Sequence, residues 1–157
     1  MVPVRIPDEL RDAICRHARE VFPAECCGYM RGTHEEGVLA ATEIVRCRNA
    51  QADGEHPTHP DRGPETGFVI AGRELFDFAR SFQTDRPAVA VYHSHTNGIA
   101  YFSQVDRDNA VAANGPAYPV QHLVVGVTAD GTTEGAIFAW SDDDSDFREV
   151  ARFDARC

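Results

Sequence analysis

Apolar residues recur along the chain at two spacings, one typical of helices and one typical of strands. Near the N-terminus, a stripe with helical spacing predicts an amphipathic helix over residues 7–21 and comprises Leu10, Ile14, Ala18 and Val21. Pro7 suits the first position of that helix. A second stripe predicts a helix over residues 71–82 and comprises Leu75, Phe78, Ala79 and Phe82.

Short apolar runs between turn residues predict the strands, which cover residues 25–32, 37–49, 87–95, 120–128, 134–141 and 147–154. A third helix is predicted over residues 103–114. Residues 50–67 are dense in Pro, Gly and Asp, which indicates a long loop insertion near 49–67. Asn49, at the end of a strand before this insertion, is interpreted as a turn residue.

The order of these elements predicts an α/β fold in which helices pack on a mixed sheet. The chain has 157 residues, which fits a single domain over residues 1–157. No internal repeat or inter-domain linker interrupts it.

Charge and hydropathy limit the partners to be expected. Lys plus Arg number 15 against 25 for Asp plus Glu, which gives a net charge of −10. An acidic domain binds nucleic acid poorly, because the phosphate backbone requires clustered Lys and Arg. We find no signal peptide and no apolar run of the roughly 18 residues that a membrane span needs. We therefore expect a cytoplasmic protein that binds neither nucleic acid nor membranes.

Adjacent cysteines, Cys26 and Cys27, lie in the first predicted strand. Consecutive strand residues point to opposite faces, so these two thiols make a poor shared metal site. We interpret them as small buried hydrophobic residues.

The segment HSHTNGIAYFSQVD, residues 93–106, contains the residues most suited to chemistry. His93 and His95 are two apart on a strand, so both imidazoles point to one face and can converge on a cation. Ser103 suits the N-cap of the third helix, and Asp106 falls in its first turn, with its carboxylate directed back toward the strand. Two neutral imidazoles and one carboxylate form an open zinc site.

The histidine pair and the S-x-x-D motif can each be explained without a metal site. In a chain with seven histidines, an H-x-H pair arises by chance in roughly one such sequence in three. S-x-x-D before an apolar run is at least as often a capping box as a catalytic motif. A metal site is favoured only because both motifs occur together, on a strand and on the helix that follows it.

The combination H-x-H-x7-S-x2-D, formed by His93, His95, Ser103 and Asp106, resembles the signature of the JAMM (MPN+) zinc metalloproteases. Upstream, the segment FPAECCGYMRG is similar to the glutamate-bearing segment of the small bacterial stand-alone members, with Glu25 as the matching residue. The family usually has proline after the second histidine and before the serine, where this chain has Thr96 and Phe102.

The resemblance implies a three-layer αβα fold of the cytidine-deaminase-like type with a mixed central sheet. It implies one catalytic Zn²⁺ held by His93, His95 and Asp106. Glu25 would be the general base, and Ser103 would stabilise the oxyanion while it also caps the helix. The reaction would be hydrolysis of the amide bond after the C-terminal Gly-Gly of a ubiquitin-like or sulfur-carrier protein. We expect residues 51–67 to form a wall of the groove for that tail.

Two other functions stay open. One is a non-catalytic MPN-type module that binds a ubiquitin-like partner, although such modules lack ligands that are all present here. The other is a zinc hydrolase of small amides or nucleobases. The nucleobase deaminases need H-x-E and P-C-x-x-C, and this chain has neither motif.

Overall fold

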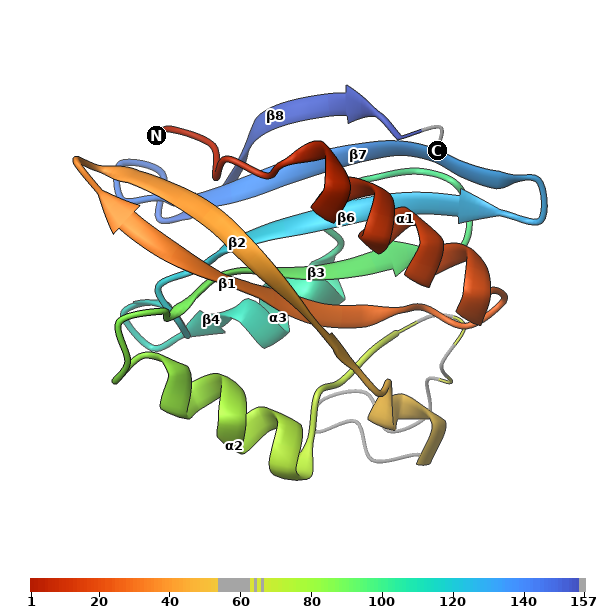
Figure 1. The fold of residues 1–157 in the computed structure, drawn as a ribbon, viewed down its shortest axis with the longest axis horizontal. Coiled ribbons are helices and arrows are strands. Elements are labelled where there is room, and N and C mark those ends of the chain that lie inside the picture. Colours follow the sequence, from red (N-terminus) through yellow and green to blue (C-terminus); the bar gives the residue numbers. More distant parts are fainter. Residues whose placement is uncertain (54–62, 64, 66, 156–157) are drawn as a thin grey trace.

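The computed structural model describes residues 1–53, 63, 65 and 67–155. Its elements, in chain order, are α1 (Asp8–Val21), β1 (Cys27–Glu35), β2 (Val38–Cys47), the 3₁₀ turn η1 (Ala50–Asp53), α2 (Gly72–Ser81), β3 (Ala88–His95), α3 (Gln104–Ala110), β4 (Val111–Ala112), β5 (Gly115–Pro116), β6 (Gln121–Thr128), β7 (Gly131–Ser141) and β8 (Asp146–Asp154). Six strands form one sheet in the order β2-β1-β3-β6-β7-β8 (Figure 1). Strands β3 and β6 are parallel, and the other neighbouring pairs are antiparallel, so the sheet is mixed as predicted.

Helices cover both faces of this sheet, which confirms the predicted mixed α/β fold. Helix α1 packs on one face, where its buried residues join a cluster that contains Tyr92 and Cys26. Cys27 belongs to a separate cluster on the opposite face, beneath α2. The two adjacent cysteines therefore point to opposite faces, and both are buried free thiols, as expected.

The apolar stripe of α1 is confirmed. Ile14 and Ala18 are fully buried, and Leu10 and Val21 pack partly buried against the same cluster. Pro7 is the N-cap rather than the first helical residue, because its backbone is extended, with ψ at 150°.

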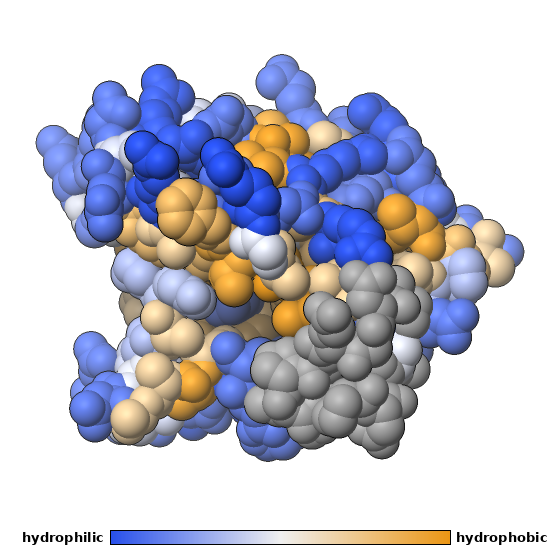
Figure 2. All heavy atoms as spheres, turned by 90° about the horizontal axis from the view of Figure 1, so that it is seen from below, coloured by the Kyte–Doolittle hydropathy of each residue, from blue (hydrophilic) through white to orange (hydrophobic). Residues whose placement is uncertain are grey.

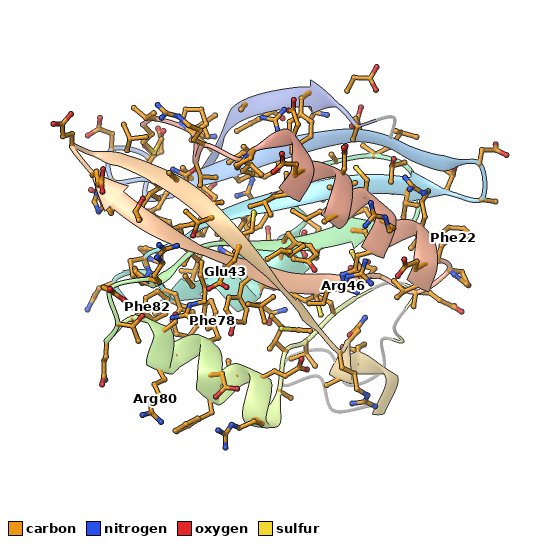
Figure 3. All side chains as sticks on the ribbon, viewed as in Figure 1. Phe22, Glu43, Arg46, Phe78, Arg80 and Phe82 are labelled. Carbon is orange, nitrogen blue, oxygen red and sulfur yellow. The ribbon has the colours of Figure 1, made fainter. Side chains whose placement is uncertain are left out.

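Of the four apolar residues predicted to form the buried side of α2, only two pack against the sheet. Phe78 is buried and contacts the rings of Tyr29 and Tyr118, and Phe82 packs beside it. Figure 3 shows both phenylalanines on the side of α2 that faces the sheet, with Arg80 directed away from it. Leu75 is 39% exposed and Ala79 is also exposed, because the sheet covers only a narrow strip of this helix.

Helix α3 ends earlier than predicted, at Ala110 instead of residue 114. The next residues form a two-stranded hairpin, in which Val111 and Ala112 pair with Pro116 and Gly115. The helix stops there because Val111 already has an extended backbone, with φ at −106° and ψ at 135°.

The predicted loop insertion near 49–67 begins with the short turn η1. Most of the remaining insertion, and with it most of the expected groove wall over residues 51–67, lies outside the described residues. In the described part of the chain, none of the helices has the length and apolar character that crossing a bilayer requires.

Candidate metal centre

The register of the sheet brings Glu25 and the two histidines together. His93 and His95 lie at the C-terminal end of β3, in the middle of the sheet. Strand β1 runs antiparallel to β3 and pairs Cys27 with His93, so the start of β1 meets the end of β3. Glu25, just before β1, therefore lies beside the histidines although it is distant in sequence.

Asp106 is directed at the histidines by a capping box at the start of α3. The Asp106 N–H donates to Ser103 Oγ at 3.1 Å, and the Ser103 N–H donates to Asp106 Oδ2 at 2.9 Å. The same Oδ2 atom lies 3.2 Å from His93 Nε2 and 3.1 Å from His95 Nε2. The predicted N-cap is therefore confirmed, and it holds the carboxylate against both imidazoles.

Three atoms form a nearly equilateral triangle, since His93 Nε2 and His95 Nε2 are also 3.2 Å apart. Ligands about 2.0–2.1 Å from a tetrahedral zinc ion lie roughly 3.3 Å from one another. The two nitrogens and Asp106 Oδ2 thus fit three corners of a tetrahedral zinc site with only a slight expansion. The fourth corner would be left for water or substrate.

The charges of these groups suit a metal. Burial lowers the pKa of His93 and outweighs the opposing effect of Asp106, so the imidazole is neutral at pH 7 and one of its ring nitrogens can bind a metal. Burial by itself raises the pKa of Asp106, but His93 and His95 lower it by more, so this carboxyl group is ionised. Imidazole nitrogens combined with a carboxylate oxygen are a donor set typical of zinc.

Contacts behind the histidines fix their orientation. His95 Nδ1 lies 3.2 Å from the Ile99 carbonyl oxygen, a contact that places its proton on Nδ1 and frees Nε2 for a cation. The ring of Phe68 stacks on His93 with a centroid distance of 4.3 Å, and Tyr101 lies against His95 at 4.5 Å. His93 is completely buried, and among the described residues its Nδ1 has no hydrogen-bond partner.

Glu25 completes a second possible ligand set. One carboxylate oxygen of Glu25 and one ring nitrogen each of His93 and His95 lie within 4.8 Å of one another. Glu25 is only 6% exposed. The structure thus brings together Glu25, His93, His95 and Asp106 around one point, and a cation there could take its third protein ligand from either carboxylate.

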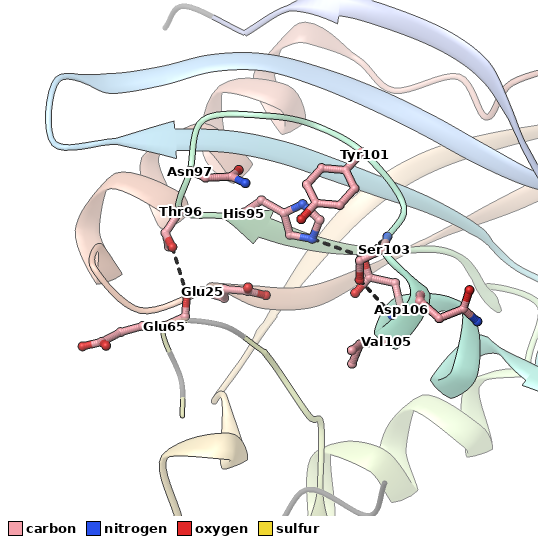
Figure 4. A pocket seen from close by; sticks show the side chains of 10 residues that line it. Glu25, Glu65, His95, Thr96, Asn97, Tyr101, Ser103, Val105 and Asp106 are labelled. Atoms are coloured by element: carbon pink, nitrogen blue, oxygen red, sulfur yellow. Dashed lines mark hydrogen bonds and ion pairs between the residues drawn. The ribbon is translucent and has the colours of Figure 1, made fainter. Parts of the chain in front are cut away.

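A cavity of about 280 Å³ opens at this point (Figure 4). Its lining includes Glu25, His95, Ser103 and Asp106, and Tyr101 forms part of its rim. All five residues singled out from the sequence therefore meet at one site, since His93 contacts Asp106 directly. Their individual roles stay predictions.

A second, more apolar cavity of about 310 Å³ lies beside His93 and Asp106. Figure 2 views the molecule from the side of α2, where hydrophobic residues gather around a hollow. The apolar residues that line the cavity are Phe68, Val69, Ile70, Leu75, Phe78, Val91, Phe102, Ala110 and Tyr118.

The loop between His95 and Ser103 is braced by side chains where prolines were expected. Thr96 Oγ1 donates to the Glu65 carbonyl oxygen at 2.9 Å, as Figure 4 shows. Phe102 is buried and packs against the rings of Phe138 and Phe147. Both replacements thus anchor the loop to neighbouring elements, by a hydrogen bond at one end and by apolar packing at the other.

Polar contacts hold the centre of the same loop. Glu134 Oε2 accepts from the Ala100 N–H at 2.8 Å, and Arg152 Nη2 donates to the Ala100 carbonyl oxygen at 2.7 Å. Thr133 Oγ1 donates to the Gly98 carbonyl oxygen at 2.7 Å. These bonds keep the Ile99 carbonyl oxygen in place for His95.

Most of the chain matches one family of known proteins. The family described as prokaryotic homologs of the JAB domain (Prok-JAB) matches residues 7–149. The chain belongs to the Prok-JAB family. A search of curated proteins gives no match.

Two solved structures share the fold of this chain at low sequence identity, and a third is less similar. A protein from Salinibacter ruber is 20% identical with a TM-score of 0.64, and the match covers 94% of this chain and 89% of that one. A protein from Desulfitobacterium hafniense is 17% identical with a TM-score of 0.64, over 93% and 88% of the two chains. A JAB1/MPN domain protein from Archaeoglobus fulgidus is 15% identical with a TM-score of 0.45, over 79% and 77%.

Membership of the Prok-JAB family is consistent with a metal ion at the histidine cluster. The family includes metal-dependent hydrolases, and this chain carries a cluster that could hold a metal ion.

Asn49 lies near the site and makes contacts there that its position in the sequence did not reveal. Its side-chain NH₂ group donates to the carbonyl oxygens of Glu25 and Gly67, and its Oδ1 accepts from two backbone N–H groups. An asparagine at the end of a strand is equally typical of a simple turn, so its position alone gave no signal.

Proposed function

We propose that this protein is a zinc-dependent metallohydrolase that cleaves the amide bond after the C-terminal Gly-Gly of a ubiquitin-like or sulfur-carrier protein. One observation carries the proposal: a three-atom ligand triangle with zinc dimensions shares a cavity with the buried Glu25 carboxylate. A purely structural zinc site would be closed by a fourth protein ligand. Here the cavity leaves room for a substrate.

We assign the metal to His93, His95 and Asp106. Bound zinc would lower the pKa of a water molecule toward 7 and polarise the scissile carbonyl group. Asp106 is preferred over Glu25 as the third ligand, because its Oδ2 already completes the triangle with both imidazole nitrogens.

Glu25 would then be the general base. Its carboxylate lies within 4.8 Å of the ligand nitrogens, a separation that one water molecule can bridge. Glu25 would accept the proton of the attacking water as oxygen bonds to the carbonyl carbon. When the C–N bond breaks, the same carboxylic acid would return the proton to the leaving amine.

Ser103 would stabilise negative charge on the carbonyl oxygen. Its Oγ accepts a hydrogen bond from the Asp106 N–H, which leaves the hydroxyl proton available to donate. The residue lies on the cavity wall next to Asp106 (Figure 4). A hydroxyl directed at the developing oxyanion lowers the barrier of acyl transfer.

A diglycine tail suits such a cavity, because it carries no side chains and can lie extended toward a buried centre. The test uses the purified protein and carrier domains that end in Gly-Gly, each fused through that tail to a short peptide. Mass spectrometry should show cleavage after the second glycine, lost on chelation and restored by zinc. A fusion with Ala-Ala in place of Gly-Gly serves as the control. Zinc-loaded protein that leaves every Gly-Gly fusion intact would refute the proposal.

A further inference from the structure

The peptide bond between Glu25 and Cys26 is held by side chains at both of its polar atoms. Its carbonyl oxygen accepts a hydrogen bond from Asn49 Nδ2 at 3.1 Å. Its N–H donates to Ser94 Oγ at 2.8 Å. Strand β1 begins only at Cys27, so these side chains hold the segment just before the regular sheet.

Asn49 is itself fixed by further bonds on all sides. Its Nδ2 also donates to the Gly67 carbonyl oxygen at 2.9 Å. Its Oδ1 accepts from the N–H groups of Gln51 at 3.0 Å and Val69 at 3.2 Å. The amide thus uses both donors and both acceptor positions, which makes it a rigid bridge between Glu25 and the segments that flank the insertion.

Ser94 links the same peptide bond to the metal ligands. It lies between His93 and His95 on β3, is completely buried, and points to the opposite face of the sheet. Its own N–H donates to the Cys26 carbonyl oxygen at 3.2 Å. Any shift of the strand that carries both histidines would therefore move the Glu25–Cys26 peptide with it.

We propose that Asn49 and Ser94 are positioning residues, which fix the plane of the Glu25–Cys26 peptide and thereby direct the Glu25 carboxylate toward the metal centre. Rotation of that plane would swing the Cα–Cβ bond of Glu25, and a displacement of about 1 Å can lower a rate by about 10²-fold. The expected loss of rate rests on the proposed function, whereas the expected displacement of the Glu25 carboxylate does not.

Three variants separate positioning from general stability. Ser94→Ala removes the acceptor for the Cys26 N–H. Asn49→Asp keeps the acceptor oxygens for Gln51 and Val69 but removes the donor to the Glu25 carbonyl oxygen. Ser81→Ala is the matched control, because Ser81 is a buried serine whose Oγ also accepts from a backbone N–H, that of Ala88 at 2.9 Å, away from the site.

The first measurement is kinetic, on the Gly-Gly fusion with zinc-loaded enzyme. Ser94→Ala and Asn49→Asp should each lower kcat by about 10–100-fold, the range typical of outer-shell partners, with KM and zinc affinity unchanged. Ser81→Ala should keep kcat within about twofold even if its melting temperature falls equally. Equal kcat values for all three variants would overturn the proposal.

The second measurement does not depend on activity. Crystal structures of the zinc-loaded variants should show the Glu25 carboxylate displaced in Ser94→Ala and Asn49→Asp and unmoved in Ser81→Ala. An unmoved carboxylate in both site variants would overturn the positioning role. If the wild-type protein cleaves no fusion at all, the proposed function fails, while these structures still decide the positioning claim.

Discussion

Replacing Ser103 by alanine should separate its observed role as a helix cap from its proposed role as an oxyanion donor. The substitution removes the hydrogen bond from the Asp106 N–H to Ser103 Oγ, 3.1 Å long. Loss of an N-cap hydroxyl costs about 1 kcal/mol. For a chain of 157 residues, that cost corresponds to a drop in melting temperature of roughly 2–4 °C.

The other half of the capping box survives the substitution. The backbone N–H of residue 103 still donates to Asp106 Oδ2, so the carboxylate keeps its direction toward the histidines. Zinc affinity should therefore stay close to that of the wild type. Removing an oxyanion donor, in contrast, should lower kcat by about 10²–10³-fold.

The assay is steady-state cleavage of a Gly-Gly fusion, well below the melting temperature, with zinc content measured on the same sample. Ser103→Thr, which keeps the hydroxyl group, is the control and should keep most of the activity. If Ser103→Ala lowers the melting temperature as expected while kcat falls only a few-fold, Ser103 is a helix cap and the oxyanion role is refuted.

Three further predictions concern pH, packing and metal binding. Burial and then Arg46 lower the pKa of His17 to about 4 in the folded protein. Its contribution to stability is therefore complete above about pH 6.5 and is lost as the pH falls toward 4, and His17→Gln should flatten this part of a urea-unfolding profile. In Gly126→Ala the new Cβ would clash with the Gly98 carbonyl oxygen, so chemical denaturation should show a loss of about 1–3 kcal/mol, and an unchanged stability would contradict this close packing. Asp106→Asn should lower zinc affinity in a competitive titration by more than the 10–100-fold typical of outer-shell partners, and an unchanged affinity would contradict its assignment as a ligand.

The strands and the meeting of the two histidines with Asp106 could be predicted because they depend on local patterns. Residues two apart on a strand share a face, so His93 and His95 had to converge wherever β3 lay in the sheet. The capping box likewise fixes Asp106 relative to Ser103 within a single turn of α3. Glu25 needed the family resemblance, because only the pairing of β1 with β3 brings it to the site.

The errors arose where tertiary packing decides the outcome. Leu75 has the right spacing for the core side of α2, but the sheet covers only the part of the helix around Phe78. The extent of α3 depended on the pairing of Val111 and Ala112 with Pro116 and Gly115, which extends the backbone where helical turns were predicted. Asn49 could not be distinguished from a turn residue until the structure placed the Glu25 carbonyl oxygen beside its amide.

The most direct test of the proposed mechanism is a side-by-side measurement of zinc content and cleavage in Glu25→Gln. Glutamine keeps the size of the side chain but cannot accept the proton of the attacking water. We predict one zinc ion per chain, an unchanged melting temperature and no cleavage of a Gly-Gly fusion that the wild type cleaves. Full activity in this variant would remove Glu25 from the mechanism, and loss of zinc would make it a ligand rather than the base.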